Sequence, residues 1–294
     1  MPAQVETPSV SYPARAFVAL QKILPTLLLT TGMHHLTRVK QRAFKNAFIR
    51  VFMRMFDISL EEAEVQNIDK FKDFNEFFTR ALKPGVRPLA EGDNQLLCPA
   101  DGRVSQFGKI QAGRLLQAKG IDYSAAALLG DAERAAAFEN GDFCTVYLAP
   151  YNYHRLHMPV TATLTHWRYD PGRLFSVNAA TAMLLPGLFH RNERLTAFFD
   201  TDYGPMAMVL VGALMVGGLE TVWSGPVTPP HGAPAEGYEP MRETRLPAGA
   251  EMGRFNMGST VILLSAPGAV RWSETLQAGQ AVQMGQSLGR WQTG

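Results

Sequence analysis

The sequence predicts an α+β protein in which amphipathic helices precede a β-rich catalytic core with a sandwich-like or barrel-like arrangement. Two observations support this prediction. Apolar residues recur at helical spacing in the first part of the chain, whereas from Leu97 onward short β-like runs are separated by glycine and proline. With 294 residues, 46% of them hydrophobic, the chain can bury a full core. We expect the helices in residues 1–70 and the catalytic domain in residues 71–294.

The earliest apolar stretch, residues 16–33, is interrupted by Gln21, Lys22 and Pro25. The uninterrupted part is too short to cross a bilayer core of about 30 Å. The opening MPAQVETPSVSYP also differs from a secretory signal, because it contains an acidic residue and three prolines. We therefore expect no transmembrane helix and a protein that stays in the cytoplasm.

Basic charge is concentrated near the start of the chain. The net charge is only +2, which argues against a general nucleic-acid-binding protein, yet residues 13–56 hold eight basic side chains and no acidic one. Within residues 41–56, apolar side chains share one helical face and basic ones surround it. The helix could dock on its own domain or lie on a membrane surface. Its phenylalanines and the lack of acidic residues favour the membrane.

Further elements follow in order. Ser59 with Glu62 three residues later predicts a helix start, and Asp73 ahead of FNEFF predicts another. The strand-like runs include CTVYLAP, MAMVLVGALMV, ETVWSG and STVILLS, with helices expected at residues 128–140 and 179–185. Residues 181–189 could be a lipid-facing loop or ordinary core.

The end of the chain and the cysteines exclude two kinds of site. The glycine spacing after residue 260 resembles that of lipoyl or biotinyl carrier domains, but no lysine follows Lys119 to carry such a group. Cys98 and Cys144 fit no metal or disulfide pattern, so we expect free thiols in a reduced compartment.

Three separated segments carry residues suited to catalysis, namely PADG at 99–102, YHRLHMP at 153–159 and MGST at 257–260. A metal site at His154 and His157 is disfavoured, because their spacing brings side chains together only on a helix and the segment reads as strand and turn. Ser259, His157 and Asp101 instead supply the residue types of an activated nucleophile. The serine lacks the G-x-S-x-G setting of a conventional hydrolase, so it can attack something other than a bound ester.

An ordered series of segments from about Phe71 to Gln292 resembles the bacterial and mitochondrial phosphatidylserine decarboxylases. The segments are FNEFFTRALKPGVRP, PADGRVSQFG, LQAKGIDYS, YHRLHMPV, PGRLFSVN, FDTDYGPMAMVLVGA, ETVWSG, TPP and EMGRFNMGSTVI. The family's cleavage tetrad is Leu-Gly-Ser-Thr, and Met257 replaces the leucine here. Methionine is apolar and of similar volume, so we expect it to be tolerated.

The resemblance implies that the chain cuts itself between Gly258 and Ser259. Ser259 attacks the Gly258 carbonyl with His157 as base and Asp101 orienting it, and elimination then releases chain 1–258. Chain 259–294 is left with a covalent pyruvoyl group in place of Ser259. Gly258 suits the attack because it has no Cβ to block the serine oxygen.

The resemblance also implies the reaction of the mature enzyme. The pyruvoyl ketone forms a Schiff base with phosphatidylserine, and CO2 leaves to give phosphatidylethanolamine. His154 handles the substrate carboxylate or protonates the carbanion.

The implied partner is an anionic membrane surface, where each nearby Lys or Arg contributes about 1 kcal/mol of attraction. We expect a peripheral protein on the cytoplasmic face of the inner membrane, with no metal and no nucleic acid, and a homodimer of processed heterodimers. Two rivals stay open: a serine hydrolase of lipid esters, which would remain one chain, and a noncatalytic carrier or membrane-binding module, which would leave the serine, histidine and aspartate without a purpose.

Overall fold

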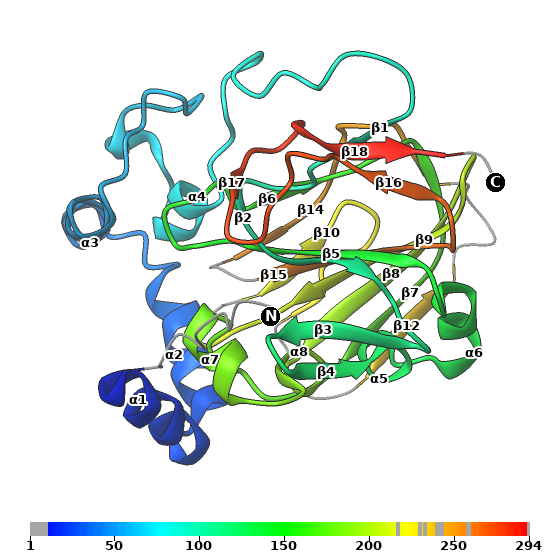
Figure 1. The fold of residues 1–294 in the computed structure, drawn as a ribbon. Helices are drawn as coiled ribbons and strands as arrows, with labels where there is room; N and C mark the ends of the chain where they lie inside the picture. The colour runs from blue at the N-terminus through cyan, green and yellow to red at the C-terminus, as the bar shows by residue number, and fades with distance from the viewer. Residues whose placement is uncertain are drawn as a thin grey trace.

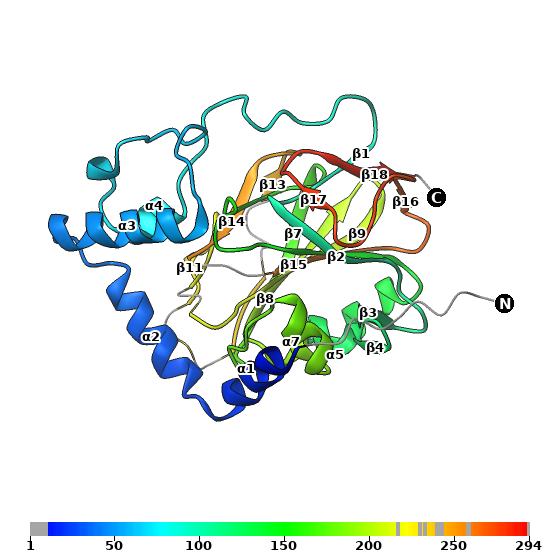
Figure 2. The same ribbon diagram turned by 60° about the vertical axis from the view of Figure 1, so that its left-hand side comes forward.

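The computed structural model describes residues 11–215, 218–228, 231, 234–238, 244–256 and 260–292. Its helical N-terminal part lies along one side of a β-rich body (Figures 1 and 2), so the α+β prediction is confirmed. The predicted cleavage segment, Met257, Gly258 and Ser259, lies outside the described residues. The long N-terminal helices are α1 (Tyr12–Ile23), α2 (Thr26–Leu36) and α3 (Arg42–Phe56).

Helices α1 and α2 are separated where the sequence predicts a break, at Leu24 and Pro25. Among the described helices, none is by itself long and apolar enough to cross a bilayer, and α1 with α2 meets that test only as a pair bent by 91°. Figure 2 shows the bend clearly, with α1 turning back beneath the body.

The two helices dock through polar side chains. The buried Gln21 amide accepts a hydrogen bond from the Ser176 backbone at 2.6 Å, and the buried Thr30 hydroxyl accepts one from the Met215 backbone at 3.1 Å. The leucines and isoleucine point outward instead: Ile23 is 80% exposed and Leu28 is 69% exposed. The usual arrangement of an amphipathic helix, with its apolar face toward the core, is therefore inverted here.

Helix α3 starts at the Gln41 cap and packs against α4 (Phe74–Phe78), whose predicted Asp73 cap is confirmed. Phe48 stacks on Phe74 with ring centroids 4.3 Å apart. The predicted apolar stripe of α3 is thus divided, because part of it packs on the protein while Phe44, Val51 and Met55 stay exposed. One predicted surface cation is buried: the Lys45 ammonium donates to the carbonyl oxygens of Ile68 and Phe71.

Two helix predictions are wrong. No helix starts at Ser59, because its hydroxyl accepts from the Glu61 backbone in a tight turn and Ala63 then pairs with Leu82. The helix expected at 128–140 is divided into α5 (Ala125–Leu129), α6 (Ala132–Ala135) and the 3-10 turn η2 (Ala136–Phe138). Gly130 causes the division, since its positive φ of 71° ends α5.

The helix expected at 179–185 is confirmed as α7 (Ala179–Leu184), and a short helix α8 (Leu188–Arg191) follows it. Leu185, Leu188 and Phe189 belong to a buried cluster beneath one face of the large sheet. Residues 181–189 are therefore mainly core rather than a lipid-facing loop. Another short helical turn, η1 (Ile68–Lys70), precedes α4.

The β-rich body contains a nine-stranded antiparallel sheet. In spatial order its strands are β12 (Ala235–Tyr238), β7 (Ala162–Asp170), β8 (Arg194–Thr201), β9 (Gly204–Val211), β15 (Thr260–Ser265), β5 (Asp142–Tyr147), β2 (Gly102–Lys109) and β17 (Ala281–Val282), and β13 (Arg245–Leu246) also pairs with β7. Strand β15 is fully buried between β9 and β5, so a central strand begins at Thr260, two residues after Gly258.

Three smaller sheets complete the body. One contains β11 (Gly225–Pro226), β10 (Leu219–Thr221), β14 (Glu251–Phe255) and β6 (Arg155–His157); the second contains β1 (Gln95–Leu97), β18 (Ser287–Trp291) and β16 (Val270–Trp272); the third pairs β3 (Arg114–Ala118) with β4 (Ile121–Ser124). The sheet of β6 and β14 positions the candidate site, because it carries the histidine segment beside the strand that leads to residue 257.

Candidate active site

The fold brings together the segments that the sequence selects. The His157 backbone donates to the Pro99 carbonyl at 2.8 Å, which joins β6 to the turn before β2. The Phe255 backbone donates to the His154 carbonyl at 3.0 Å, which joins the same segment to the end of β14. Residues 257–259 follow directly, and the residues on either side of them, Asn256 and Thr260, are both buried. The site is therefore assembled from three distant parts of the chain.

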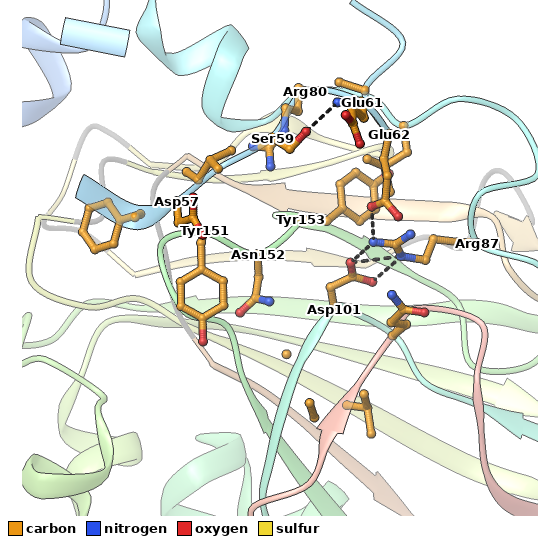
Figure 3. Close-up of a pocket in the computed structure, with 18 of the residues that line it drawn as sticks. Asp57, Ser59, Glu61, Glu62, Arg80, Arg87, Asp101, Tyr151, Asn152 and Tyr153 are labelled. Carbon is orange, nitrogen blue, oxygen red and sulfur yellow. Dashed lines mark hydrogen bonds and ion pairs between the residues drawn. The ribbon is translucent and has the colours of Figure 1, made fainter. Parts of the chain in front are cut away.

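Asp101 is held by partners that the sequence did not suggest. Its carboxylate accepts from the Arg87 guanidinium at 2.7 to 3.0 Å and from the Met284 backbone at 2.8 Å. The same guanidinium also contacts Glu62 at 2.8 Å (Figure 3). Burial alone would lower the pKa of Arg87, but its hydrogen bonds to these two carboxylates outweigh burial and raise it. Arg87 thus stays a cation and holds Asp101 in place.

His157 is oriented by a carbonyl and a hydroxyl. Its Nδ1 lies 2.9 Å from the Gly249 carbonyl oxygen, and its Nε2 lies 3.0 Å from the Tyr153 hydroxyl. A carbonyl only accepts hydrogen bonds, so we assign the ring proton to Nδ1 and the lone pair to Nε2. Burial lowers the pKa of His157 and raises that of Tyr153 to about 12. The result is a neutral imidazole with its basic nitrogen facing a protonated tyrosine.

Asp101 and His157 share the site, but no hydrogen bond joins them in the part of the chain that the structure describes. The carboxylate acts on the imidazole through its charge, which makes a small contribution toward a higher pKa of His157. The ring's tautomer and orientation come from Gly249 instead.

His154 occupies the most enclosed position of the site. It is fully buried and stacks on Phe78 with ring centroids 4.1 Å apart. Burial, reinforced by the charge of Arg80, lowers its pKa to about 3, so the ring is neutral at physiological pH. Neither ring nitrogen makes a hydrogen bond of good geometry among the described residues, although the nearby backbone of Pro150 and Ala149 partly offsets the lowering of the ring's pKa. Two unsatisfied nitrogens in a buried ring indicate a place for a polar group that the described chain does not supply.

A polar pocket of about 690 Å³ opens beside these residues. Asp101, Arg80 and Tyr153 line it, and Figure 3 shows Arg87 bridging Asp101 to Glu62 at one side of it. A second, apolar pocket of about 480 Å³ is lined in part by Phe78. It is lined mainly by side chains of α3 and of the segments after β5 and β9, including Phe52, Met55, Leu148, Ala213 and Met215.

Comparison with known proteins decides the family. The family model described as phosphatidylserine decarboxylase matches residues 74–290, and a second, described as PSD, matches residues 16–57. The chain belongs to the phosphatidylserine decarboxylase family. The relatives named phosphatidylserine decarboxylase proenzyme include one from Methylococcus capsulatus and one from Pseudomonas putida, each 50% identical over 279 residues, or 94% of this chain and 97% of the relative. One from Bordetella avium is 49% identical over 92% of this chain and 93% of its own.

Sequence reasoning missed several residues that shape this site. Tyr153 lies within the YHRLHMP segment and Arg87 lies within GVRP, but the sequence pattern assigned no function to either residue. Gly249 had no signal at all, because it acts through its backbone carbonyl. Only the folded chain identifies such contacts.

The Arg87 contact yields a stability prediction. Arg87→Met leaves the Asp101 carboxylate buried without its cation, which is expected to lower the free energy of unfolding by about 3–5 kcal/mol. Thermal or urea unfolding of Ser259→Ala protein, which is expected to remain a single uncut chain, measures this change. The control is Arg114→Met, which breaks a half-exposed pair with Asp122 and is expected to leave the free energy of unfolding nearly unchanged. Equal small losses in both variants would contradict the prediction.

Proposed function

We propose that this chain is a phosphatidylserine decarboxylase made as a proenzyme, which cuts itself between Gly258 and Ser259 and converts Ser259 into a pyruvoyl group. The proposal is supported by family membership over nearly the whole chain, and by relatives that are named proenzymes. The observation that carries it is the assembly of the Pro99–Gly102 turn, both histidines and the two flanks of residues 257–259 in one place.

The first proposed step is the attack of Ser259 on the Gly258 carbonyl, with His157 Nε2 taking the hydroxyl proton. The Gly249 carbonyl keeps the lone pair on Nε2, as a triad carboxylate would. The Tyr153 hydroxyl has to turn away from Nε2 before the serine proton can reach it. The charge of Asp101 stabilises the imidazolium that forms, which gives Asp101 an electrostatic role in place of the direct contact expected from the sequence.

The mature site is proposed to use His154 next to the pyruvoyl group. When present, that group supplies a ketone conjugated with a second carbonyl, which accepts electrons as CO2 leaves. The nitrogens of His154 fit this setting, because the ring N–H can donate to the substrate carboxylate. The negative charge of that carboxylate favours the protonated ring, which can then deliver a proton to the reacting carbon. Stacking on Phe78 fixes the plane of the ring, and burial keeps water away from it.

The substrate is proposed to reach this site from a membrane surface. The outward faces of α1, α2 and α3 expose apolar side chains among basic ones, and the polar docking contacts of Gln21 and Thr30 keep those faces turned outward. The apolar pocket beneath α3 leads from these helices toward Leu148 and Ala213, beside the start of β15. This apolar pocket is suited to the part of the acyl chains that lies nearest the phosphatidylserine headgroup. We propose a peripheral protein on the cytoplasmic face of the membrane, active as a homodimer of processed heterodimers.

Membrane docking is tested with two exposed residues of the outward face. Ile23→Ser with Leu28→Ser is expected to lower binding to vesicles containing phosphatidylserine by roughly tenfold. The reason is that two largely exposed apolar side chains are no longer there to enter the lipid. Co-sedimentation with the vesicles measures it. The control is Leu116→Ser with Val222→Ser, which removes exposed apolar side chains from the β-rich body. A control that loses binding equally would contradict this docking face.

The proposed function itself is tested by the intact mass of purified, denatured protein. Two chains are expected, one that ends at Gly258 and one that begins at position 259. The mass of the smaller chain should be lower, by one ammonia, than that of a peptide that starts with serine. An active preparation of uncut chains would overturn the proposal and favour a serine hydrolase.

A further inference from the structure

A buried carboxylate paired with a histidine is present in this protein, although at residues that the mechanism above does not use. His231 Nδ1 lies 2.6 Å from a carboxylate oxygen of Glu193, and both side chains are largely buried, at 7% and 2% exposure. A carboxylate accepts the Nδ1 proton and leaves the lone pair of a neutral imidazole on Nε2. Nε2 is buried and has no partner among the described residues. The pair therefore has the geometry of the acid and base in a catalytic triad.

Glu193 is held firmly in this position. Its carboxylate accepts from the Tyr169 hydroxyl at 3.0 Å and from the Thr228 hydroxyl at 3.4 Å. The pair is therefore positioned by strand β7, by the residue that precedes β8 and by the segment after β11. A carboxylate with this many donors stays fixed while its histidine moves a proton.

The pair lies beside both flanks of the predicted cleavage segment. On one flank, the Asn256 backbone donates to the Gly218 carbonyl, and a Cβ at position 218 would clash with the carbonyl oxygen of Thr228. The Thr228 hydroxyl is one of the donors to Glu193. On the other flank, Thr260 pairs with Val211, and the next residue, Gly212, donates its backbone N–H to the Glu193 carbonyl at 2.8 Å. A side chain at position 212 would lie 3.3 Å from the Glu193 carboxylate, which leaves little room between them.

Maturation requires a second proton removal that the residues named so far do not perform. After the backbone shifts onto the Ser259 oxygen, the Cα proton of residue 259 has to be removed before the ester can eliminate. His157 takes the hydroxyl proton in the step before, and His154 is assigned to the later decarboxylation. His231 is the remaining buried histidine whose basic nitrogen is oriented by a carboxylate near this segment.

We propose that His231 is the base of the elimination step and that Glu193 positions it; this rests on the proposed self-cleavage. His231 Nε2 takes the Cα proton, and the electron pair of that bond forms the Cα–Cβ double bond. The Cβ–Oγ bond breaks, and the Gly258 carboxylate leaves with its electrons. The proton then passes from His231 to water, so that the base is restored.

His231→Ala is expected to stop maturation at the ester, with elimination slowed roughly 100-fold or more. The chain then keeps its full mass but becomes sensitive to neutral hydroxylamine, which splits the ester into a 1–258 hydroxamate and a 259–294 chain that starts with an intact serine. Added imidazole is expected to restore elimination by occupying the space of the lost side chain. Restoration also shows that the variant is folded. Intact mass spectrometry follows each species over time.

Glu193→Gln provides the test of positioning, and it is expected to slow elimination less than loss of the base itself. The control is His190→Ala, which removes a partly exposed histidine of α8 and should mature at the parental rate. His231→Ala protein that matures at the parental rate would overturn the proposal. So would an uncut chain that hydroxylamine leaves intact, because the block would then precede the ester. An uncut parental protein would instead overturn the proposed self-cleavage.

Discussion

His157→Ala is expected to leave the protein as a single uncut chain that hydroxylamine does not split. In the proposed mechanism the imidazole takes the Ser259 proton, and loss of a general base slows such a step by about 10²–10⁴. The Gly249 carbonyl orients the ring but cannot replace it, because a carbonyl oxygen is a far weaker base. The time course of intact mass after expression measures the effect. This result differs from that expected for His231→Ala, which reaches the ester.

The matched control for this experiment is His35→Ala on helix α2. His35 is exposed on the helical side of the molecule, so its loss removes an imidazole without touching the site. The control should be cut at the parental rate. If the His157 variant were also cut at that rate, another base would have to activate Ser259.

His154→Gln is expected to impair decarboxylation without impairing cleavage. The variant chain should be cut normally but should release little CO2. In the proposed mechanism the His154 ring acts on the substrate after maturation, so its loss is expected to lower the rate of decarboxylation by about 10²–10⁴. Glutamine keeps a polar side chain of similar length but cannot take up or deliver a proton near neutral pH. The measurement is CO2 release from phosphatidylserine in detergent micelles, per mole of fully cut enzyme.

His190→Ala serves as the control because it removes an imidazole of α8 that lines neither of the two pockets. It should be cut and should retain most of its decarboxylase activity. An uncut His154→Gln chain would place His154 in maturation and would reverse the roles assigned to the two histidines.

The sequence predicted the local elements where a single short pattern decides them. The Asp73 cap, the break at Pro25 and the apolar runs of β5, β9 and β15 all appear in the structure as expected. The helix predictions failed where another local backbone conformation was more stable than the helix. Ser59 satisfies its hydroxyl in a turn rather than starting a helix, and Gly130 divides a segment whose alanines favour one continuous helix.

The candidate site could be predicted as a set of residue types but not as a set of contacts. The order of motifs selected Asp101, His154 and His157, yet it could not show that Asp101 bonds Arg87 and that Gly249 orients His157. Those contacts join residues that are 14 and 92 positions apart. Pairings at such separations depend on strand register, which one sequence without relatives does not specify.

The central position of strand β15 has a consequence for the unfolding and refolding of the mature enzyme. The proposed cut between Gly258 and Ser259 would make this strand part of a separate polypeptide that is still enclosed by β9 and β5 of the other chain. The 36-residue piece from Ser259 to the end of the chain also contributes β17 and β18, which pair with β2 and β1. Folding must therefore come before cutting, while the strand is still tethered. Once the mature enzyme unfolds, recovery requires two chains to meet again, so its lifetime is set by the rate of unfolding rather than by an equilibrium.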